Sequence, residues 1–359
     1  MKALILCAGE ATRLRPLTYA LPKHLLPVAN RPVIEHVIDA IKRAGITEIG
    51  LVVSLKTMEQ FRAHLGDGQR RGVQLEYILQ PEPRGLAHAV ACARDFVSQD
   101  DFLVYLGDNL VEEGLTTLLQ EFREARPEAL LSLVKVEDPR RFGVAVLEGN
   151  EIKRLIEKPA EPLSNLAIAG IYVFQPIIFE AISEIRPSPR GELEITDAIQ
   201  RLIDRGYRVL PHRIEGWWKD VGKPEDLLEA NRLLLRRLGD TSLEGAWLDE
   251  ATATTLEGPV ALAPGVKVRN SHITGPVVIG ADAEISNAQV GPDVALGRRC
   301  HIAQVRIQNA IIMEGARISG GPALPTLTDS IIGADAVIAL QSNGRYQLLV
   351  ANRSRVASE

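Results

Sequence analysis

The chain has 359 residues, enough for two domains and a large hydrophobic core, with an ordinary 46% of hydrophobic and 24% of charged residues. The net charge is −5 and there is no long basic run, which argues against nucleic acid or an anionic membrane as a partner. No segment approaches the roughly 20 apolar residues of a membrane span, and the N-terminus lacks a signal-peptide pattern. Cys7, Cys92 and Cys300 lie far apart, so we expect a cytoplasmic protein without disulfides or structural zinc.

The first 235 or so residues alternate short apolar runs with helical patterns. The strand-like runs lie at 3–6, 49–53, 75–79, 102–106, 129–136 and 170–174, and the helical patterns at 32–44, 58–65, 85–96, 114–125, 176–182, 194–205 and 224–238. This alternation predicts βαβ units, and hence an α/β fold with a mainly parallel mixed sheet. In such sheets the ligand binds at the carboxyl ends of the strands, so the loops after the strands are the place to search for chemistry.

After about residue 250 the helical period disappears and short motifs recur, each with an aliphatic residue about every six positions. The motifs are IGADAEI (279–285), VGPDVAL (290–296), IMEGARI (312–318) and IGADAVI (332–338). A period of about 18 residues, or three hexads, forms one coil of a three-sided parallel β-helix. The pattern breaks at 319–328, which indicates an excursion from one corner of the helix.

A glycine-containing turn follows the first predicted strand, in LILCAGEATRLRPLT (4–18). The backbone N–H groups of such a turn can approach phosphate oxygens, and Arg13 adds a forked cation for the same oxygens. This pattern alone is equally typical of a tight turn with a surface arginine. Lys23 follows within about ten residues, in PKHLLPVANRP (22–32), and favours the phosphate-binding interpretation.

These two motifs together resemble the start of a sugar-1-phosphate nucleotidylyltransferase. Within that family the chain most resembles glucose-1-phosphate thymidylyltransferases of the long form, which carry a C-terminal left-handed β-helix. The resemblance implies a Rossmann-like nucleotidyltransferase domain at 1–236, a linker at 237–250, a left-handed parallel β-helix at 251–345 and a tail at 346–359.

The resemblance also implies a nucleotide site. It comprises Ala8, Gly9, Glu10, Ala11, Thr12 and Arg13, together with Gln80, Gly85 and Asp108. Gln80 would bind the pyrimidine, because a side-chain amide offers a donor and an acceptor to a thymine or uracil edge. The family usually has glycine at the position of Ala11. If that backbone needs a positive φ, alanine there costs about 1 kcal/mol or more.

Two acids would hold a magnesium ion. Asp108 follows a predicted strand in LGDN (106–109), and Asp220 lies in GWWKDVG (216–222). The resemblance makes both of them ligands of Mg²⁺, a hard cation that suits carboxylates, phosphate oxygens and water.

For the sugar phosphate it implies Asn109, Gly143, Glu157, Lys158, Ile168, Gly170 and Arg190. Lys158 and Arg190 would hold the phosphate, while Glu157 and the Gly143 backbone would bind sugar hydroxyls.

The implied reaction transfers a nucleotidyl group from dTTP to α-D-glucose 1-phosphate and releases pyrophosphate, by in-line attack on the α-phosphorus. The catalytic residues would be Arg13, Lys23, Asp108, Lys158 and Asp220. They would act by positioning and charge neutralisation, since the attacking oxygen is already an anion and needs no general base.

Three alternatives stay open. The donor could be UTP, because one methyl group discriminates thymine from uracil by only about 1–3 kcal/mol, and the acceptor could be glucose 1-phosphate, glucosamine 1-phosphate or N-acetylglucosamine 1-phosphate. The β-helix could add acetyltransferase activity, with His272 or His301 as the base, although a structural role for both is favoured. The chain could also be a regulatory subunit without catalysis. We expect a homo-oligomer, with a trimer through the β-helix as the candidate form.

Overall fold

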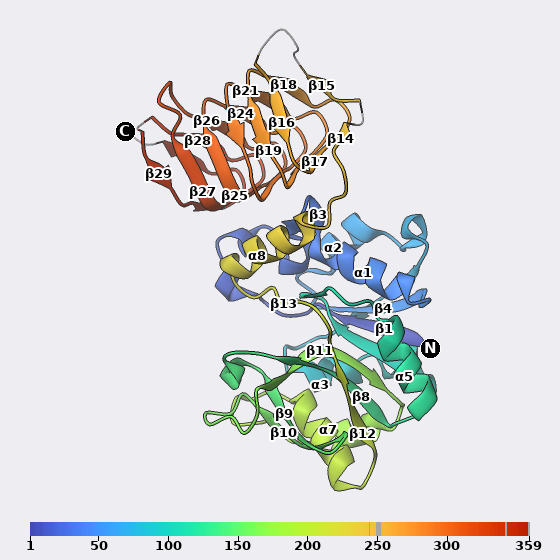
Figure 1. Ribbon diagram of the computed structural model, residues 1–359. Coiled ribbons are helices and arrows are strands. Elements are labelled where there is room, and N and C mark those ends of the chain that lie inside the picture. The colour runs from blue at the N-terminus through green and yellow to red at the C-terminus, as the bar shows by residue number, and fades with distance from the viewer. Residues whose placement is uncertain (244, 249–252, 342, 358–359) are drawn as a thin grey trace. The chain divides into compact units, whose positions relative to one another are not determined.

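The computed structural model describes residues 1–243, 245–248, 253–341 and 343–357 (Figure 1). Two compact units make up the chain: Met1–Glu10 with Ile34–Asp220, called the first unit, and Ala11–Val33 with Val221–Glu359, called the second unit. These units are defined by contacts between residues, whereas a domain is defined by independent folding. The predicted domain boundaries at 236, 250 and 345 therefore stay a prediction. The parts of the predicted linker, β-helix and tail at 244, 249–252, 342 and 358–359 lie outside the described residues.

A mixed nine-stranded sheet forms the centre of the first unit, with the strand path β10-β9-β11-β6-β1-β4-β5 and with β8 joining β11 to β12. Strand β1 runs parallel to both β4 and β6, whereas β11 runs antiparallel to β6 and β8. The strands are β1 (Lys2–Leu6), β4 (Glu48–Val53), β5 (Gln74–Leu79), β6 (Phe102–Leu106), β8 (Ala129–Lys135), β9 (Gly143–Glu148), β10 (Glu151–Glu157), β11 (Leu166–Phe174) and β12 (Val209–Arg213). The expected Rossmann-like α/β class is confirmed.

Buried side chains cover both faces of this sheet. Leu4 and Leu6 of β1 share one hydrophobic cluster with Val90 and Ile199, which lie on helices α3 and α7. Successive side chains of a strand point to opposite faces, so Ile5, which is also buried, belongs to the other face. The helices of this unit are α1 (Val33–Arg43, whose first residue lies in the second unit), α2 (Met58–Leu65), α3 (Leu86–Ala91), α4 (Arg94–Val97), α5 (Thr116–Ala125), α6 (Ile178–Glu184) and α7 (Ile195–Asp204).

Two predicted elements differ in the structure. The helix predicted at 85–96 is divided into α3 and α4, because the backbone leaves the helical region at Ala93, where ψ is 9°. The strand predicted at 170–174 is the second half of the longer β11. The prediction also missed β9, β10 and β12 of the central sheet. It missed as well a two-stranded sheet of β7 (Asn109–Val111) and β13 (Trp218–Asp220), in which each strand has three residues.

The second unit carries the parallel β-helix, which confirms the repeats. Lys267, Glu284 and His301 are paired in register, so these coils are 17 residues long (284 − 267 and 301 − 284), one fewer than predicted. The next two steps in the same stack, to Arg317 and Val337, are 16 and 20 residues (317 − 301 and 337 − 317). The long step contains the expected excursion, which is confined to residues 320–325 between two strands.

One inward-facing stack shows why the coils hold together. Val268, Ile285, Ile302, Ile318 and Ile338 pair in register and are all buried in a single cluster. The strands are β14 (Ser242–Leu243), β15 (Trp247–Leu248), β16 (Thr255–Glu257), β17 (Val260–Leu262), β18 (Lys267–Arg269), β19 (His272–Thr274), β20 (Val277–Ile279), β21 (Glu284–Ser286), β22 (Gln289–Val290), β23 (Val294–Leu296), β24 (His301–Ala303), β25 (Arg306–Ile312), β26 (Arg317–Ser319), β27 (Thr326–Ile332), β28 (Val337–Ala339), β29 (Arg345–Tyr346), β30 (Leu349–Val350) and β31 (Arg355–Ala357). No single coil can bury its inner face alone, so stability comes from stacking.

Corner residues turn each coil with a left-handed backbone. Asn270, Asn287 and Gln304 follow one another at one corner, with φ of 42°, 52° and 53°. The Asn270 Nδ2 atom donates a hydrogen bond to Asn287 Oδ1 at 2.7 Å. Asparagine tolerates this conformation better than most residues, which explains the recurring asparagines in the repeats.

The second unit also contains the hairpin β2 (Pro27–Val28) with β3 (Arg31–Pro32) and the helix α8 (Pro224–Leu235). Helix α8 packs against β23, β25 and β27 of the β-helix and against β2 of the hairpin. Among the described residues, every helix is too short or too polar to cross a membrane.

Candidate functional site

Both predicted magnesium ligands lie in the first unit, and Asp220 pairs with Asn109, the residue that follows Asp108. Strand β6 ends at Leu106, and the Gly107 N–H then bonds the Leu6 carbonyl at 3.0 Å, which leaves Asp108 in the turn at the strand's carboxyl end. Strand β7 begins at the next residue, Asn109, and pairs with β13 so that Asp220 faces Asn109. The antiparallel pair thus brings Asp220 beside Asp108 from more than a hundred residues away in the chain.

Asn109 is buried between the strand ends. Its side chain is 2% exposed, and its Oδ1 atom has no hydrogen-bond partner among the described residues. A Cβ atom placed on Gly170, where φ is 73°, would lie 2.6 Å from Asn109 Nδ2 and 2.7 Å from a methyl of Leu106. The glycine therefore gives Asn109 room, and the open acceptor of the amide suits a ligand hydroxyl.

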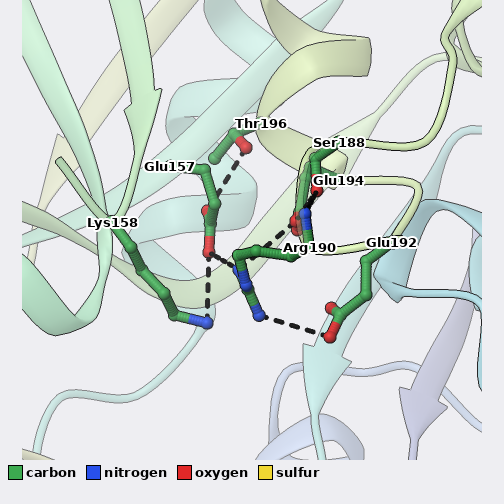
Figure 2. A network of polar contacts seen from close by, with 7 residues as sticks. All are labelled: Glu157, Lys158, Ser188, Arg190, Glu192, Glu194 and Thr196. Atoms are coloured by element: carbon green, nitrogen blue, oxygen red, sulfur yellow. Dashed lines mark hydrogen bonds and ion pairs between the residues drawn. The ribbon is translucent and has the colours of Figure 1, made fainter.

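A network of charged side chains surrounds Glu157 at the end of β10 (Figure 2). The Arg190 Nη1 atom lies 3.2 Å from Glu157 Oε1 and 3.3 Å from Glu194 Oε1. The Lys158 Nζ atom lies 3.4 Å from the same Glu157 oxygen, and Thr196 Oγ1 donates to Glu157 Oε2 at 3.2 Å. The structure thus brings together three residues predicted to bind the sugar phosphate: Glu157, Lys158 and Arg190.

The network holds Arg190 by several carboxylates. Besides Glu157 and Glu194, Glu192 lies 3.3 Å from Arg190 Nη2, and Ser188 donates to Glu194 at 2.8 Å. Burial raises the pKa of the Glu194 carboxyl above its ordinary value, and the Ser188 hydroxyl offsets part of that shift. A phosphate oxygen that binds Arg190 must compete with these carboxylates, while the 40% exposure of the arginine side chain leaves it within reach of a ligand.

Gly143 and Ile168 belong to the same cluster. Gly143 pairs with Glu157 across β9 and β10. A Cβ atom on Gly143 would lie 2.7 Å from Thr196 Cγ2 and 3.1 Å from both Glu157 Oε2 and Ile168 Cδ1. Glycine at this position therefore leaves room for the Thr196 and Glu157 side chains, and the expected contact of its backbone with sugar hydroxyls stays a prediction.

Glu157, Arg190 and Glu194 of this network line a cavity of about 820 Å³. Arg154 and Arg186, which the sequence analysis did not single out, line it together with Asp197. Burial, with a further contribution from the Glu157 charge, raises the pKa of the Asp197 carboxyl. No local signal in the sequence could have found the two arginines, since their side chains reach the cavity from β10 and from the loop before α7.

The predicted base-binding residues form a separate cluster in the first unit. Gln80 is 5% exposed, and its Nε2 atom donates to the Gly85 carbonyl at 3.2 Å. A Cβ atom on Gly85, where φ is 105°, would lie 2.5 Å from the Leu193 carbonyl oxygen. His88, expected as a helix residue, lies on α3 with its Nδ1 atom 3.2 Å from Gln80 Nε2. It orients the amide, a contact that the sequence analysis missed.

The predicted phosphate loop starts in the first unit. Ala8, Gly9 and Glu10 follow β1, and no atom lies within 4 Å of a Cβ placed on Gly9. The Glu10 carboxylate forms an ion pair with Lys56 at 2.7 Å on the surface. The open space at Gly9 is what a backbone that approaches a ligand needs.

The rest of the loop belongs to the second unit. Ala11 has φ 46° and ψ 46°, the left-handed region in which alanine is strained. Thr12 and Arg13 follow in a 3₁₀ turn, Thr12–Leu14, and Lys23 opens a further turn, Lys23–Leu25. The backbone at Ala11 thus has the positive φ at which alanine is expected to cost stability relative to glycine.

The two histidines considered as acetyl-transfer bases lie on the β-helix. Hydroxyl groups hold both ring nitrogens of His272: Thr255 Oγ1 contacts Nδ1, and Thr274 Oγ1 lies 3.0 Å from Nε2. The His301 Nδ1 atom lies 3.1 Å from the Arg299 carbonyl oxygen. These contacts favour a structural role for both.

Comparisons with known proteins point to one family. The family model described as nucleotidyl transferase matches residues 2–237. The chain is 50% identical over 266 residues to the low-salt glycan biosynthesis nucleotidyltransferase Agl11 of Haloferax volcanii, which covers 73% of each chain. It is 42% identical over 360 residues to a glucose-1-phosphate thymidylyltransferase of Streptomyces antibioticus, which covers 99% of each.

A solved structure is also similar. It is a crystal structure from Bacillus anthracis, described as a glucose-1-phosphate thymidylyltransferase in complex with sucrose. Its sequence is 39% identical to this chain and its TM-score is 0.62, over 65% of this chain and 94% of that one.

Proposed function

The chain belongs to the nucleotidyl transferase family, and on that premise we propose that it transfers a thymidylyl group from dTTP to α-D-glucose 1-phosphate. The products would be dTDP-glucose and pyrophosphate. The full-length similarity to a glucose-1-phosphate thymidylyltransferase supports this substrate pair.

The pairing of Asp220 with Asn109 is the observation that carries the chemical assignment. It supports a site in which Asp220 lies near Asp108 at the carboxyl end of a central strand, where ligands bind in sheets of this kind. The described residues contain no group of three or more His, Cys, Asp or Glu side chains that could hold a metal alone. Two carboxylates, completed by water and by substrate phosphates, instead fit Mg²⁺.

Asp108 and Asp220 would hold this ion, which when bound supplies a Lewis acid for the phosphate oxygens of the nucleotide. The chain's own cations act on the substrates. The loop amides from Ala8 to Thr12 and the Arg13 guanidinium would bind the triphosphate oxygens, and Lys23 would neutralise charge near the reacting phosphorus.

Gln80, oriented by His88, would bind the pyrimidine edge beside Gly85. Asn109, Gly143, Glu157, Ile168 and Gly170 would enclose the sugar, with Glu157 accepting from its hydroxyl groups. Lys158 and Arg190 would hold the sugar phosphate.

Bond formation in this scheme needs no proton transfer. A phosphate oxygen of the sugar forms a bond to the α-phosphorus, and the bond from that phosphorus to the bridging oxygen breaks, with its electron pair leaving on pyrophosphate. The attacking oxygen is already anionic, so Lys158 and Arg190 act by aligning it with the departing oxygen. Arg13 and Lys23 stabilise the charge that develops on the leaving group.

Pyrophosphate release tests the proposal. The purified full-length chain would be assayed with magnesium and five nucleotides (dTTP, UTP, CTP, GTP and ATP) against glucose 1-phosphate and N-acetylglucosamine 1-phosphate, with Asp108→Asn as the control. We expect the highest kcat/KM for dTTP with glucose 1-phosphate, and loss of activity in the variant. A higher value with UTP or the amino sugar would overturn the substrates, and no release with any pair would overturn the activity.

The assembly and location of the protein belong to the same proposal. The parallel β-helix offers open coil ends and flat faces for a homo-oligomer, for which a trimer is the candidate form. Cys7, Cys92 and Cys300 form no disulfide bond, which agrees with the reducing cytoplasm, where we place the protein.

A further inference from the structure

Two asparagines tie the hairpin after Lys23 to the β-helix. At the hairpin tip, Ala29 and Asn30 both have left-handed backbones, with φ of 47° and 62°. The Asn30 side chain leaves the tip and its Nδ2 atom donates to the Leu296 carbonyl at 2.5 Å and, at the longer distance of 3.4 Å, to the Val278 carbonyl. These carbonyls belong to β23 and β20, two neighbouring coils of the β-helix.

Asn231 of α8 makes a second connection and is completely buried. Its Oδ1 atom accepts a hydrogen bond from the Ala29 N–H at 2.8 Å, and its Nδ2 atom donates to the Asp293 carbonyl at 3.3 Å. One side chain thus bridges the hairpin tip and a corner of the β-helix. A polar side chain that is fully buried is retained only when its hydrogen bonds are made, so this bridge is specific.

The hairpin is connected rigidly to the residues proposed to bind the triphosphate. The Leu26 N–H bonds the Lys23 carbonyl at 3.1 Å, and Val33 N–H bonds the Leu26 carbonyl at 3.1 Å. Leu14, Leu17, Leu25, Leu26 and Val28 are all buried and anchor the segment from 11 to 33 at several points, two of them shortly after Lys23. A displacement of the hairpin tip is therefore transmitted to Lys23 rather than absorbed by a loose loop.

We infer that the β-helix is a support for the nucleotide-phosphate segment, and that Asn30 and Asn231 are positioning residues for Arg13 and Lys23. This inference rests on the proposed function for the roles of those two cations. It assigns the β-helix a part in nucleotide binding besides the assembly of an oligomer. All residues of this connection, from the hairpin and α8 to the β-helix, belong to the second unit.

Substitutions at Asn30 test the inference. Asn30→Gly keeps the positive φ and removes the carboxamide, whereas Asn30→Asp keeps the shape but turns a carboxylate toward two carbonyl oxygens. Asn270→Gly, at a surface corner of the β-helix with φ 42°, is the matched control. Hydrogen–deuterium exchange of the full-length chain would be followed in residues 11–33. We expect faster exchange there in both Asn30 variants and unchanged exchange in the control.

Kinetics separate a positioning role from a merely structural one. In Asn30→Gly we expect the KM for dTTP to rise about two- to tenfold, the range that one net hydrogen bond supports, with the KM for glucose 1-phosphate and the melting temperature nearly unchanged. Equal changes of both KM values, or none, would overturn the positioning role. Unchanged exchange in 11–33 would overturn the connection itself, and it can be measured even if the wild-type chain proves inactive and the proposed function fails.

Discussion

Gly170 lies against Asn109 so closely that a Cβ atom on the glycine would stand 2.6 Å from the amide nitrogen. The contact is with a buried side chain at the strand ends, where movement is restricted by Leu106 on the same side. The absence of a side chain at Gly170 therefore gives the Asn109 side chain its room, and Asn109 is the residue of β7 that pairs with Asp220.

Gly170→Ala is expected to reduce kcat/KM for glucose 1-phosphate at least tenfold, because the new methyl group displaces the Asn109 amide. The strain of a positive φ adds to the effect, at about 1–2 kcal/mol of stability. Steady-state kinetics and thermal denaturation would measure both. Gly206→Ala separates the two causes, since Gly206, in the turn after α7, has φ 81° but no atom within 4 Å of its added Cβ. If both variants lose activity equally, strain rather than the clash with Asn109 explains the loss.

Arg190→Gln is expected to raise the KM for glucose 1-phosphate and to lower kcat/KM by about 10- to 150-fold, while the KM for dTTP changes little. A hydrogen bond to a charged group contributes about 1.5–3 kcal/mol, and the fork of Arg190 would supply such bonds to the sugar phosphate. Arg186→Gln is the matched control, because Arg186 lines the adjacent cavity without an ion pair in the described network. A similar loss in the control would indicate that net charge, rather than the Arg190 fork, matters.

Ala11→Gly is expected to raise the free energy of unfolding by up to about 1 kcal/mol. The left-handed conformation costs alanine about 1–2 kcal/mol, and the greater freedom of glycine in the unfolded chain offsets part of the gain. Chemical denaturation would measure it. Ala20→Gly, at an ordinary φ of −100°, should change stability in the opposite direction. A loss of stability in both variants would mean that the φ of Ala11 stores no strain.

The sequence alone predicts much of this site, because its signals are local. Asp108 follows an apolar strand directly, and a loop after a central strand is where α/β proteins bind ligands. The roles given to Asp108, Gln80 and Gly85 come from the family resemblance and stay predictions. The hexad spacing predicts the β-helix, although the observed coil of 17 residues is one residue shorter than three ideal hexads.

Other features depend on contacts that no local pattern encodes. The pairing of Asp220 with Asn109 uses two strands of three residues each, too short to leave a period in the sequence. The positive φ at Ala11 depends on the path of the loop, so it could not be predicted from the residue type. From the sequence, Asn30 is predicted only as a turn residue and Asn231 only as a helix residue. Their hydrogen bonds to backbone carbonyls of the β-helix depend on the tertiary structure.

The acid stability of the first unit should depend on Glu35 of α1. Burial alone would raise the pKa of this carboxyl, but hydrogen bonds from His64 at 2.8 Å and Arg71 at 2.7 Å outweigh it and lower the pKa to about 2. The folded-state pKa is thus below the ordinary value of 4.5. Its stabilisation, about 3 kcal/mol at most, is present above pH 4.5 and is lost as the pH falls toward 2.

Glu35→Gln should therefore lower stability at neutral pH and flatten the fall in stability between pH 4.5 and 2. Denaturation with urea at a series of pH values would show this as two curves that converge at low pH. Glu59→Gln is the control, since Glu59 is exposed and lies 3.6 Å from Arg62 in a surface pair worth little. Parallel curves for Glu35→Gln and the wild type would show that the bonds to His64 and Arg71 do not hold the carboxylate in its charged form.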